Sequence, residues 1–269
     1  MGQEIKKLAK TTLFISILFF FFLLGIKDGE CQGMDRKEGI LSSFKRKIPK
    51  EWGERVRGVK TRLNTDQKVI ALTFDACRGP RSLSYDEKLI RFFSEEKIPA
   101  TLFMSGKWID ANQEIFKELA KNPLFEVGNH GLNHKPCSVN GRSAYGIEGT
   151  KSVGEIFDEI EGNALKIQSL TGRKPKYYRP AAAHCDEICV EVAKVLGYEV
   201  VNFSVLGDAG ATYSRNQVKE ALLRATPSSI VLMHMNHPES ETAEGMMEAI
   251  PELKRRGFRF VKLSELGLR

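Results

Sequence analysis

Short apolar runs alternate with amphipathic segments from Val69 to Lys262, and this alternation constrains the fold more than any other feature. The expected strands cover residues 69–74, 100–104, 125–128, 177–179, 199–204, 230–234 and 258–262. The expected helices cover residues 84–95, 112–121, 154–170, 186–196, 217–225 and 244–256. Regular strand–helix alternation indicates parallel strands covered by helices. The number of strands favours an α/β barrel or an incomplete barrel.

In parallel barrels the catalytic residues collect at the carboxyl ends of the strands. Side chains of the types that hydrolytic chemistry needs stand at or just after five of the expected strand ends: Asp75, His130, His134, Arg179, Asp208 and His234. Each of them alone is equally well explained as a cap, a core residue or a surface ion pair. Their joint placement predicts a single site.

The segment His130-Gly131-Leu132-Asn133-His134 carries two imidazoles four residues apart. On a helical turn this spacing puts both rings on one face, close enough to bind one cation. Gly131 stands where the zinc-protease motif has its glutamate, so a general base has to come from elsewhere, and Asp75 is the natural candidate. The sequence contains neither a phosphate-binding P-loop nor a Gly-x-Ser-x-Gly nucleophile motif.

Five motifs in this order resemble those of the NodB-type polysaccharide deacetylase family, over residues 69–268. They are Leu-Thr-Phe-Asp at 72–75, Ala-Thr-Leu-Phe-Met-Ser-Gly at 100–106, Gly-Asn-His-Gly-Leu-Asn-His at 128–134, Tyr-Arg-Pro at 178–180 and Leu-Met-His at 232–234. The resemblance implies a distorted (β/α)₇ barrel over residues 68–269. It also implies metal-dependent hydrolysis of N-acetyl groups on polymeric amino sugars such as peptidoglycan or chitin oligosaccharides, or of O-acetyl groups in some members.

The resemblance assigns the metal and the base. His130 and His134 would bind a divalent cation, with Zn²⁺ the first choice, and Asp75 would be the general base. Arg179 would orient the Asp75 carboxylate and balance its charge.

The resemblance also assigns the acid and the oxyanion donor. His234 would protonate the leaving amine, with Asp208 supporting its imidazolium form. A backbone N–H after Pro180, that of Ala182, would stabilise the oxyanion.

The chain departs from the family pattern at the third metal ligand. The family usually has a second acid directly after the base, and here that position is Ala76. We favour His184 as the substitute ligand because it follows a barrel strand. Cys77 as a thiolate and Asp75 itself are the alternatives.

The charge and hydropathy pattern of residues 1–31 predicts an export signal or an N-terminal anchor. Three lysines, Lys6, Lys7 and Lys10, precede an apolar run over residues 13–26 that is short for a membrane span. Residues 32–67 are polar and are expected to form a tether and lead-in to the domain. We therefore expect an exported protein in the periplasm, the cell envelope or the medium, with membrane contact only through the N-terminal segment.

Export predicts an oxidising compartment, in which cysteines form disulfides. Cys77 and Cys137 both follow expected site residues, so we expect at least one disulfide to hold these loops, with the partners left open. The net charge of +7 suits an anionic envelope polymer, and no basic run interleaved with aromatics indicates nucleic acid as a partner.

The leading hypothesis is a metal-dependent deacetylase that acts on an envelope polysaccharide, peptidoglycan first. One alternative is a hydrolase with another acyl substrate, either an O-acetyl polysaccharide ester or a formamido sugar. The other alternative is a sugar-binding pseudoenzyme that lost its metal together with the acid at position 76.

Overall fold

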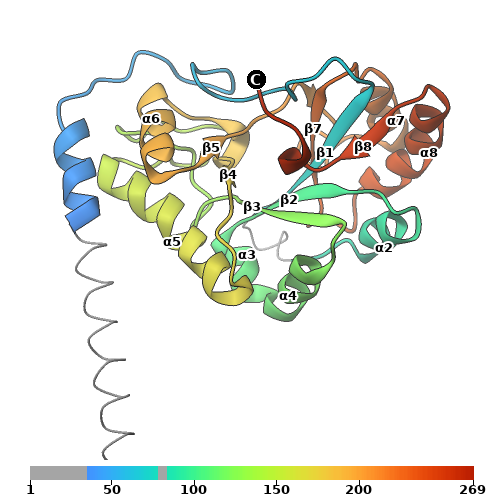
Figure 1. The fold of residues 1–269 in the computed structure, drawn as a ribbon, viewed down its shortest axis with the longest axis horizontal. Coiled ribbons are helices and arrows are strands. Elements are labelled where there is room, and N and C mark those ends of the chain that lie inside the picture. The colour runs from blue at the N-terminus through green and yellow to red at the C-terminus, as the bar shows by residue number, and fades with distance from the viewer. Residues whose placement is uncertain (1–34, 78–83) are drawn as a thin grey trace, which may run out of the picture. The chain divides into compact units, whose positions relative to one another are not determined.

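The computed structural model describes residues 35–77 and 84–269 (Figure 1). The expected signal or anchor segment, residues 1–31, and the loop 78–83 lie outside the described residues. In the described part, no helix has both the length and the apolar character that a membrane crossing requires. The chain divides into two compact units, Met1–Arg46 and Lys47–Arg269. In the first unit, residues 35–44 form a helix.

The second unit is built on a parallel sheet. Its strands in the described residues are β1 (Val69–Ala76), β2 (Ala100–Met104), β3 (Phe125–Asn129), β4 (Tyr177–Tyr178), β5 (Glu199–Val200), β6 (Val205–Leu206), β7 (Ser229–His234) and β8 (Arg259–Val261). The strand order is β5-β4-β3-β2-β1-β7-β6, and β8 also pairs with β1. The parallel pairing and the curled sheet confirm the (β/α)₇ barrel-type fold that the sequence predicted.

The helices between the strands also confirm the predicted alternation. They are α2 (Glu87–Glu95), α3 (Gly106–Ala111), α4 (Gln113–Lys121), α5 (Val153–Thr171), α6 (Glu187–Leu196), α7 (Arg215–Leu223) and α8 (Thr242–Arg255). Figure 1 shows them arranged around the outside of the strands. The short helix α3 was not predicted from the sequence.

The expected single strand over residues 199–204 is two short strands in the structure. β5 pairs with β4 at one end of the strand order, and β6 pairs with β7 at the other end. The link between them is short: the amide of Val201 donates to Tyr178, and the amide of Ser204 donates to Ile230. The sheet must therefore curl so that its two edges approach each other, which produces an incomplete barrel.

Strand β1 separates two apolar clusters, because successive side chains of a strand point to opposite faces. Ile70, Leu72, Phe74 and Ala76 belong to the large outer core. Ala71 belongs to the smaller inner cluster, together with Phe103 and Tyr177 from neighbouring strands. The same alternation directs Thr73 and Asp75 to the inside of the barrel.

The second unit begins at Lys47, so residues 47–67, expected as a lead-in, are part of it. Backbone bridges join Gly53 to Cys185 and Lys60 to Val201. Leu63 is fully buried in the inner cluster. This segment therefore closes part of the inner core.

Candidate active site

The predicted site residues are brought together at the carboxyl ends of the strands. Asp75 on β1 and His234 on β7 are register partners, and the amide of Met235 donates to the carbonyl of Asp75 at 3.1 Å. His130 directly follows β3, and Arg179 directly follows β4. The parallel sheet thus aligns four ends from different parts of the chain at one edge.

Arg179 holds the Asp75 carboxylate in a fixed orientation inside the barrel. Its Nη1 donates to Oδ1 of Asp75 at 2.8 Å, and its Nη2 donates to the Thr73 hydroxyl at 2.9 Å. Its Nε donates to the carbonyl of Val201, and its guanidinium lies over the Phe103 ring. Both members of the ion pair are almost fully buried. A buried charged pair of this kind is tolerated because the remaining donors of the arginine are also satisfied.

The tautomer of neutral His130 follows from a single hydrogen bond. Its Nδ1 lies 2.8 Å from the carbonyl oxygen of Arg179. A carbonyl can only accept, so Nδ1 carries the proton and the Nε2 lone pair is available as a ligand. This Nε2 atom is 3.5 Å from the Asp75 carboxylate and 3.5 Å from the thiol of Cys77. Burial by itself would lower the pKa of His130, but Asp75 and then Cys77 raise it above its ordinary value.

Residues 130–134 form a bend rather than the helical turn that the spacing suggested. Gly131 and His134 both have positive φ, 80° and 58°. Glu159 of α5 stabilises the bend, because its carboxylate accepts from the amides of Asn133 and Lys135. A Cβ on Gly131 would lie 2.4 Å from Oε1 of Glu159, so only glycine fits.

The bend still brings the two histidines together, as predicted. The ring centroids of His130 and His134 are 4.8 Å apart. Within the described residues, Nε2 of His134 is buried and has no hydrogen-bond partner. A buried ring nitrogen without a partner, next to the His130 Nε2 atom whose lone pair can act as a ligand, fits a site that binds a cation.

One ligand atom each from Cys77, His130 and His134 lies within 4.8 Å of the others. Sequence reasoning ranked Cys77 below His184 as a third ligand, on the assumption that an exported thiol would be oxidised. The alternation of side chains along β1 could have favoured Cys77 from the sequence alone. Ala76 faces the outer core, so residues 75 and 77 on either side of it face the inside of the barrel. These donors fit a transition-metal cation such as zinc.

The surroundings of Cys77 favour its ionised form. Burial raises the pKa of the thiol, but the nearby charges of His134 and His234 and the contact with His130 Nε2 outweigh burial. The pKa of Cys77 is therefore held well below its ordinary value.

The second predicted catalytic pair is also in contact. Nδ1 of His234 is 2.9 Å from Oδ1 of Asp208, and the other carboxylate oxygen accepts from the His234 amide and from the Thr242 hydroxyl. Asp208 is fully buried. Burial alone would lower the pKa of His234, but Asp208, then Cys77, raise it well above its ordinary value. The imidazolium form of His234 is therefore favoured near neutral pH.

The predicted oxyanion donor lies on the tight turn after Pro180. Ala182 and Ala183 have φ of 56° and 55°, a region that costs non-glycine residues energy. Ala182 lines the same cavity as the histidines. Strained backbone that borders a cavity is typical of functional sites.

The structure does not bring His184 into the group of candidate ligands. Its Nδ1 is 2.7 Å from the carbonyl of Ala182. Its ring packs edge-on against Trp52 and Tyr145, with centroids 5.8 and 5.5 Å away. His184 thus supports the rim of the site in this structure.

A disulfide holds the loop after His134, as the sequence analysis expected. It joins Cys137 to Cys189 of α6, while Cys77 and Cys185 are free. The carboxylate of Asp186, which caps α6, also accepts from the amide of Val139 in the same loop. The loop is therefore attached to α6 by a covalent bond and a hydrogen bond.

These residues surround a cavity of about 450 Å³. Its lining includes Asp75, Cys77, His130, His134, Ala182 and His234. Tyr145, in the long loop after His134, also borders the cavity and is 80% exposed. An exposed aromatic ring that borders such a cavity is suited to bind a sugar ring.

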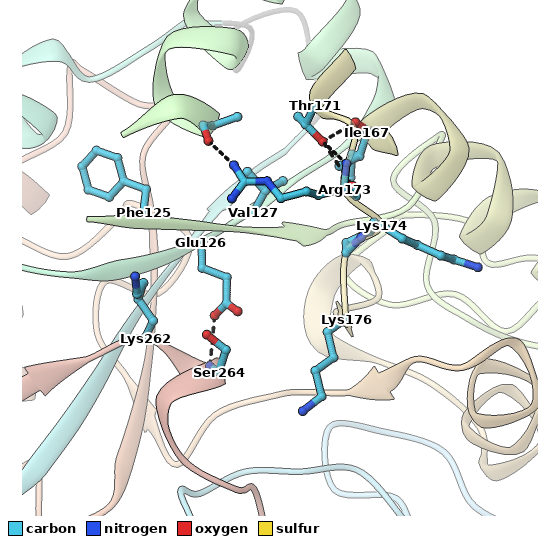
Figure 2. Close-up of a pocket in the computed structure, with 12 residues that line it drawn as sticks. Phe125, Glu126, Val127, Ile167, Thr171, Arg173, Lys174, Lys176, Lys262 and Ser264 are labelled. Atoms are coloured by element: carbon cyan, nitrogen blue, oxygen red, sulfur yellow. Dashed lines mark hydrogen bonds between the residues drawn. The ribbon is translucent and has the colours of Figure 1, made fainter. Parts of the chain in front are cut away.

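A second hollow lies at the amino-terminal end of β3, where Phe125 begins the strand (Figure 2). It is rich in cations, but each of them has a protein partner. Arg173 donates to Ala120, Lys262 donates to Pro123, Lys174 pairs with Glu161, and Lys176 pairs with Glu199. This hollow is distant in the fold from the carboxyl ends of the strands and contains none of the predicted catalytic residues.

Comparison with known proteins agrees with this geometry. Residues 62–201, more than half of the chain, match the family model described as polysaccharide deacetylase. The peptidoglycan-N-acetylglucosamine deacetylase of Bacillus cereus is 28% identical over 205 residues, which cover 75% of this chain and 89% of that protein. The peptidoglycan-N-acetylmuramic acid deacetylase PdaA of Bacillus subtilis is 25% identical over 211 residues, which cover 76% of this chain and 73% of that protein.

Solved structures show the same fold. A peptidoglycan N-acetylglucosamine deacetylase crystallised with a hydroxamate-type ligand superposes with a TM-score of 0.65 at 23% identity, over 78% of this chain and 92% of that chain. A carbohydrate esterase family 4 pseudoenzyme from Bacillus anthracis superposes with a TM-score of 0.64 at 24% identity, over 77% of this chain and 67% of that chain. From the family match and the strand-end geometry together, we conclude that this chain belongs to the polysaccharide deacetylase family.

Proposed function

We propose that this chain is an exported, metal-dependent deacetylase that hydrolyses N-acetyl groups of an envelope polysaccharide, with peptidoglycan amino sugars as the substrate. The observation that carries the proposal is the position of the two acid–base groups. Asp75 and His234 are register partners on adjacent strands, and both line the cavity that His130 and His134 also line. Amide hydrolysis needs a base, an acid and an electrophile around one carbonyl.

Asp75 acts as the general base. Oδ1 is occupied by Arg179, so Oδ2 is the oxygen that takes the proton from the attacking water. The fixed guanidinium orients the carboxylate before the substrate arrives, which contributes to the rate because no reorganisation is needed during the reaction.

His234 acts as the general acid. Its Nδ1 is hydrogen-bonded to Asp208, which leaves Nε2 to protonate the sugar nitrogen as the carbon–nitrogen bond breaks. Acetate and the free amine are the products. The amide of Ala182 donates to the oxyanion that develops on the acyl oxygen.

His130 and His134 would hold the cation. When bound, a zinc-type cation would supply Lewis acidity and would lower the pKa of water toward neutrality.

The substrate class is supported by charge, by the cavity and by relatives. The net charge of +7 favours an anionic envelope polymer over a neutral one. The curated relatives described above are named for deacetylation of the two amino sugars of peptidoglycan. The exposed Tyr145 at the cavity mouth offers a surface on which a sugar ring can stack.

The test is acetate release from purified peptidoglycan and from chitin oligomers, with the metal content of the same sample measured. We expect acetate from peptidoglycan, with chitin oligomers the poorer substrate, and stoichiometric metal in the active sample. Mass spectrometry of the product separates acetate from formate, so a deformylase would be recognised. A sample that binds glycan yet contains no metal and releases no acyl group would make the chain a pseudoenzyme instead.

A further inference from the structure

The position next to the two histidines is occupied by a sulfur atom. Cys77 is free, because Cys137 forms its disulfide with Cys189. The Cys77 sulfur is 3.5 Å from Nε2 of His130, the nitrogen whose lone pair is available. The three donor atoms of Cys77, His130 and His134 all lie within 4.8 Å of one another, and His134 Nε2 is buried without a partner.

The other candidates for a third ligand are engaged elsewhere. One oxygen of Asp75 is bound by Arg179, and the other is needed as the base. Ala76 has no donor atom, and its side chain is buried in the outer core. His184 is directed to the carbonyl of Ala182 and packs against two aromatic rings.

We propose that Cys77 is the third protein ligand of the cation, which makes this a two-histidine, one-thiolate site selective for zinc-like cations. The inference deepens the proposed function and depends on it only in assuming that a divalent cation binds at His130 and His134. It departs from the pattern of the family, in which a carboxylate follows the base.

The thiolate changes which cations the site accepts. Thiolate is a soft ligand that favours zinc and cobalt, whereas magnesium, calcium and manganese prefer carboxylates, carbonyls and water. Two imidazoles and one thiolate also leave a fourth tetrahedral position open, as catalytic zinc sites require. We therefore expect tight zinc binding and no useful binding of magnesium.

A different role for Cys77 would be covalent catalysis. His234 lines the same cavity as Cys77 and is hydrogen-bonded to Asp208, so these three residues resemble the nucleophile, base and orienting acid of a thiol hydrolase. The free nitrogen of His134 has no use in that scheme, and for this reason we favour the ligand role. The experiments separate the two roles.

The first experiment measures the cation directly in the full-length protein. The metal is removed with a chelator, and the protein is reloaded with Co²⁺, Zn²⁺, Mn²⁺ or Mg²⁺. In the wild type, Co²⁺ should give an intense near-ultraviolet thiolate-to-metal charge-transfer band. The band should persist in Cys185→Ala, which removes the other free cysteine of the described residues, and in His184→Ala. It should be absent in Cys77→Ser.

Zinc affinity provides a second readout on the same variants. Cys77→Ser should weaken zinc binding by at least ~10-fold in a chelator competition, since even outer partners of metal ligands contribute 10–100-fold. Cys77→Asp should recover binding with a preference moved toward Mn²⁺. The assignment would be overturned if Cys77→Ser bound zinc as tightly as the wild type. It would also be overturned if His184→Ala lost as much zinc affinity as His130→Ala.

A third measurement needs no variant. Alkylation of the native wild type, followed by peptide mass spectrometry, should modify Cys77 in the metal-free protein, and Zn²⁺ but not Mg²⁺ should protect it. Equal labelling with and without zinc would contradict the proposal. An acetyl group trapped on Cys77 during turnover would show the nucleophile role.

The outcomes distinguish this inference from the proposed function. A charge-transfer band without acetate release would refute the deacetylase and leave the ligand assignment standing. Acetate release by a zinc-loaded Cys77→Ser protein of normal zinc affinity would refute the ligand assignment and leave the deacetylase standing.

Discussion

Asp75 and His234 face each other as register partners on the adjacent parallel strands β1 and β7. Each is held by a buried partner of opposite charge, Arg179 for the aspartate and Asp208 for the histidine. The two proposed catalytic roles therefore depend on the pairing of β1 with β7 and on two separate buried ion pairs. Single substitutions can test each role without disturbing the other.

Asp75→Asn should lower kcat by at least ~10²-fold, the scale for the loss of a positioned base. The amide keeps an oxygen that can accept from Arg179, so the buried guanidinium stays paired and the fold should persist. Steady-state acetate release measures the effect. The zinc content of the variant should equal that of the wild type, and wild-type turnover would remove Asp75 from the mechanism.

Asp208→Asn should lower kcat and change its pH dependence. Asp208 is a positioning residue that raises the pKa of His234. The general acid must be protonated, so activity is lost as the pH rises through the pKa of His234. Without the carboxylate charge that pKa falls, and the alkaline limb of the kcat profile should move to lower pH. If kcat fell by the same factor at every pH and the alkaline limb kept its wild-type position, Asp208 would have a purely structural role.

Gly131→Ala should weaken zinc binding and lower the melting temperature. The new Cβ would meet the Glu159 carboxylate that holds the bend carrying His134, and φ of 80° is unfavourable for alanine. Gly172→Ala, at the end of α5, is the matched control because its φ is 72° with no atom within 4 Å of the added Cβ. Both variants should melt lower, and only Gly131→Ala should lose zinc in a competition assay. Equal zinc affinity in the two variants would mean that Glu159 does not position His134.

Cys189→Ser should destabilise the protein by about 2–4 kcal/mol, the typical contribution of a disulfide. The bond closes a separation of 52 residues and attaches the loop after His134 to α6. Denaturant unfolding with and without reductant measures the change. In peptide maps of the denatured, unreduced wild type, Cys77 and Cys185 should be alkylated while Cys137 and Cys189 are not. Alkylation of Cys137 in that sample would contradict the pairing.

The sequence alone predicted the elements of the barrel and the edge at which the site lies. Strands and helices follow from periodicities of two and 3.6, which are properties of neighbouring residues. In parallel barrels the catalytic residues lie at the carboxyl ends of the strands, and this rule alone predicted that Asp75 and His234 lie in the same site. The spacing of His130 and His134 was sufficient to pair them, although the backbone between them bends instead of forming a helical turn.

Only the tertiary structure decided the contacts between segments far apart in the chain. Cys137 pairs with Cys189 of α6, and this choice leaves Cys77 free beside the histidines. His184 packs against Trp52 and Tyr145 instead of joining the proposed metal ligands, and the carboxylate of Glu159 lies next to Gly131. No local periodicity specifies such contacts, because they form only when the sheet curls and brings its strand ends and the surrounding loops to the same place.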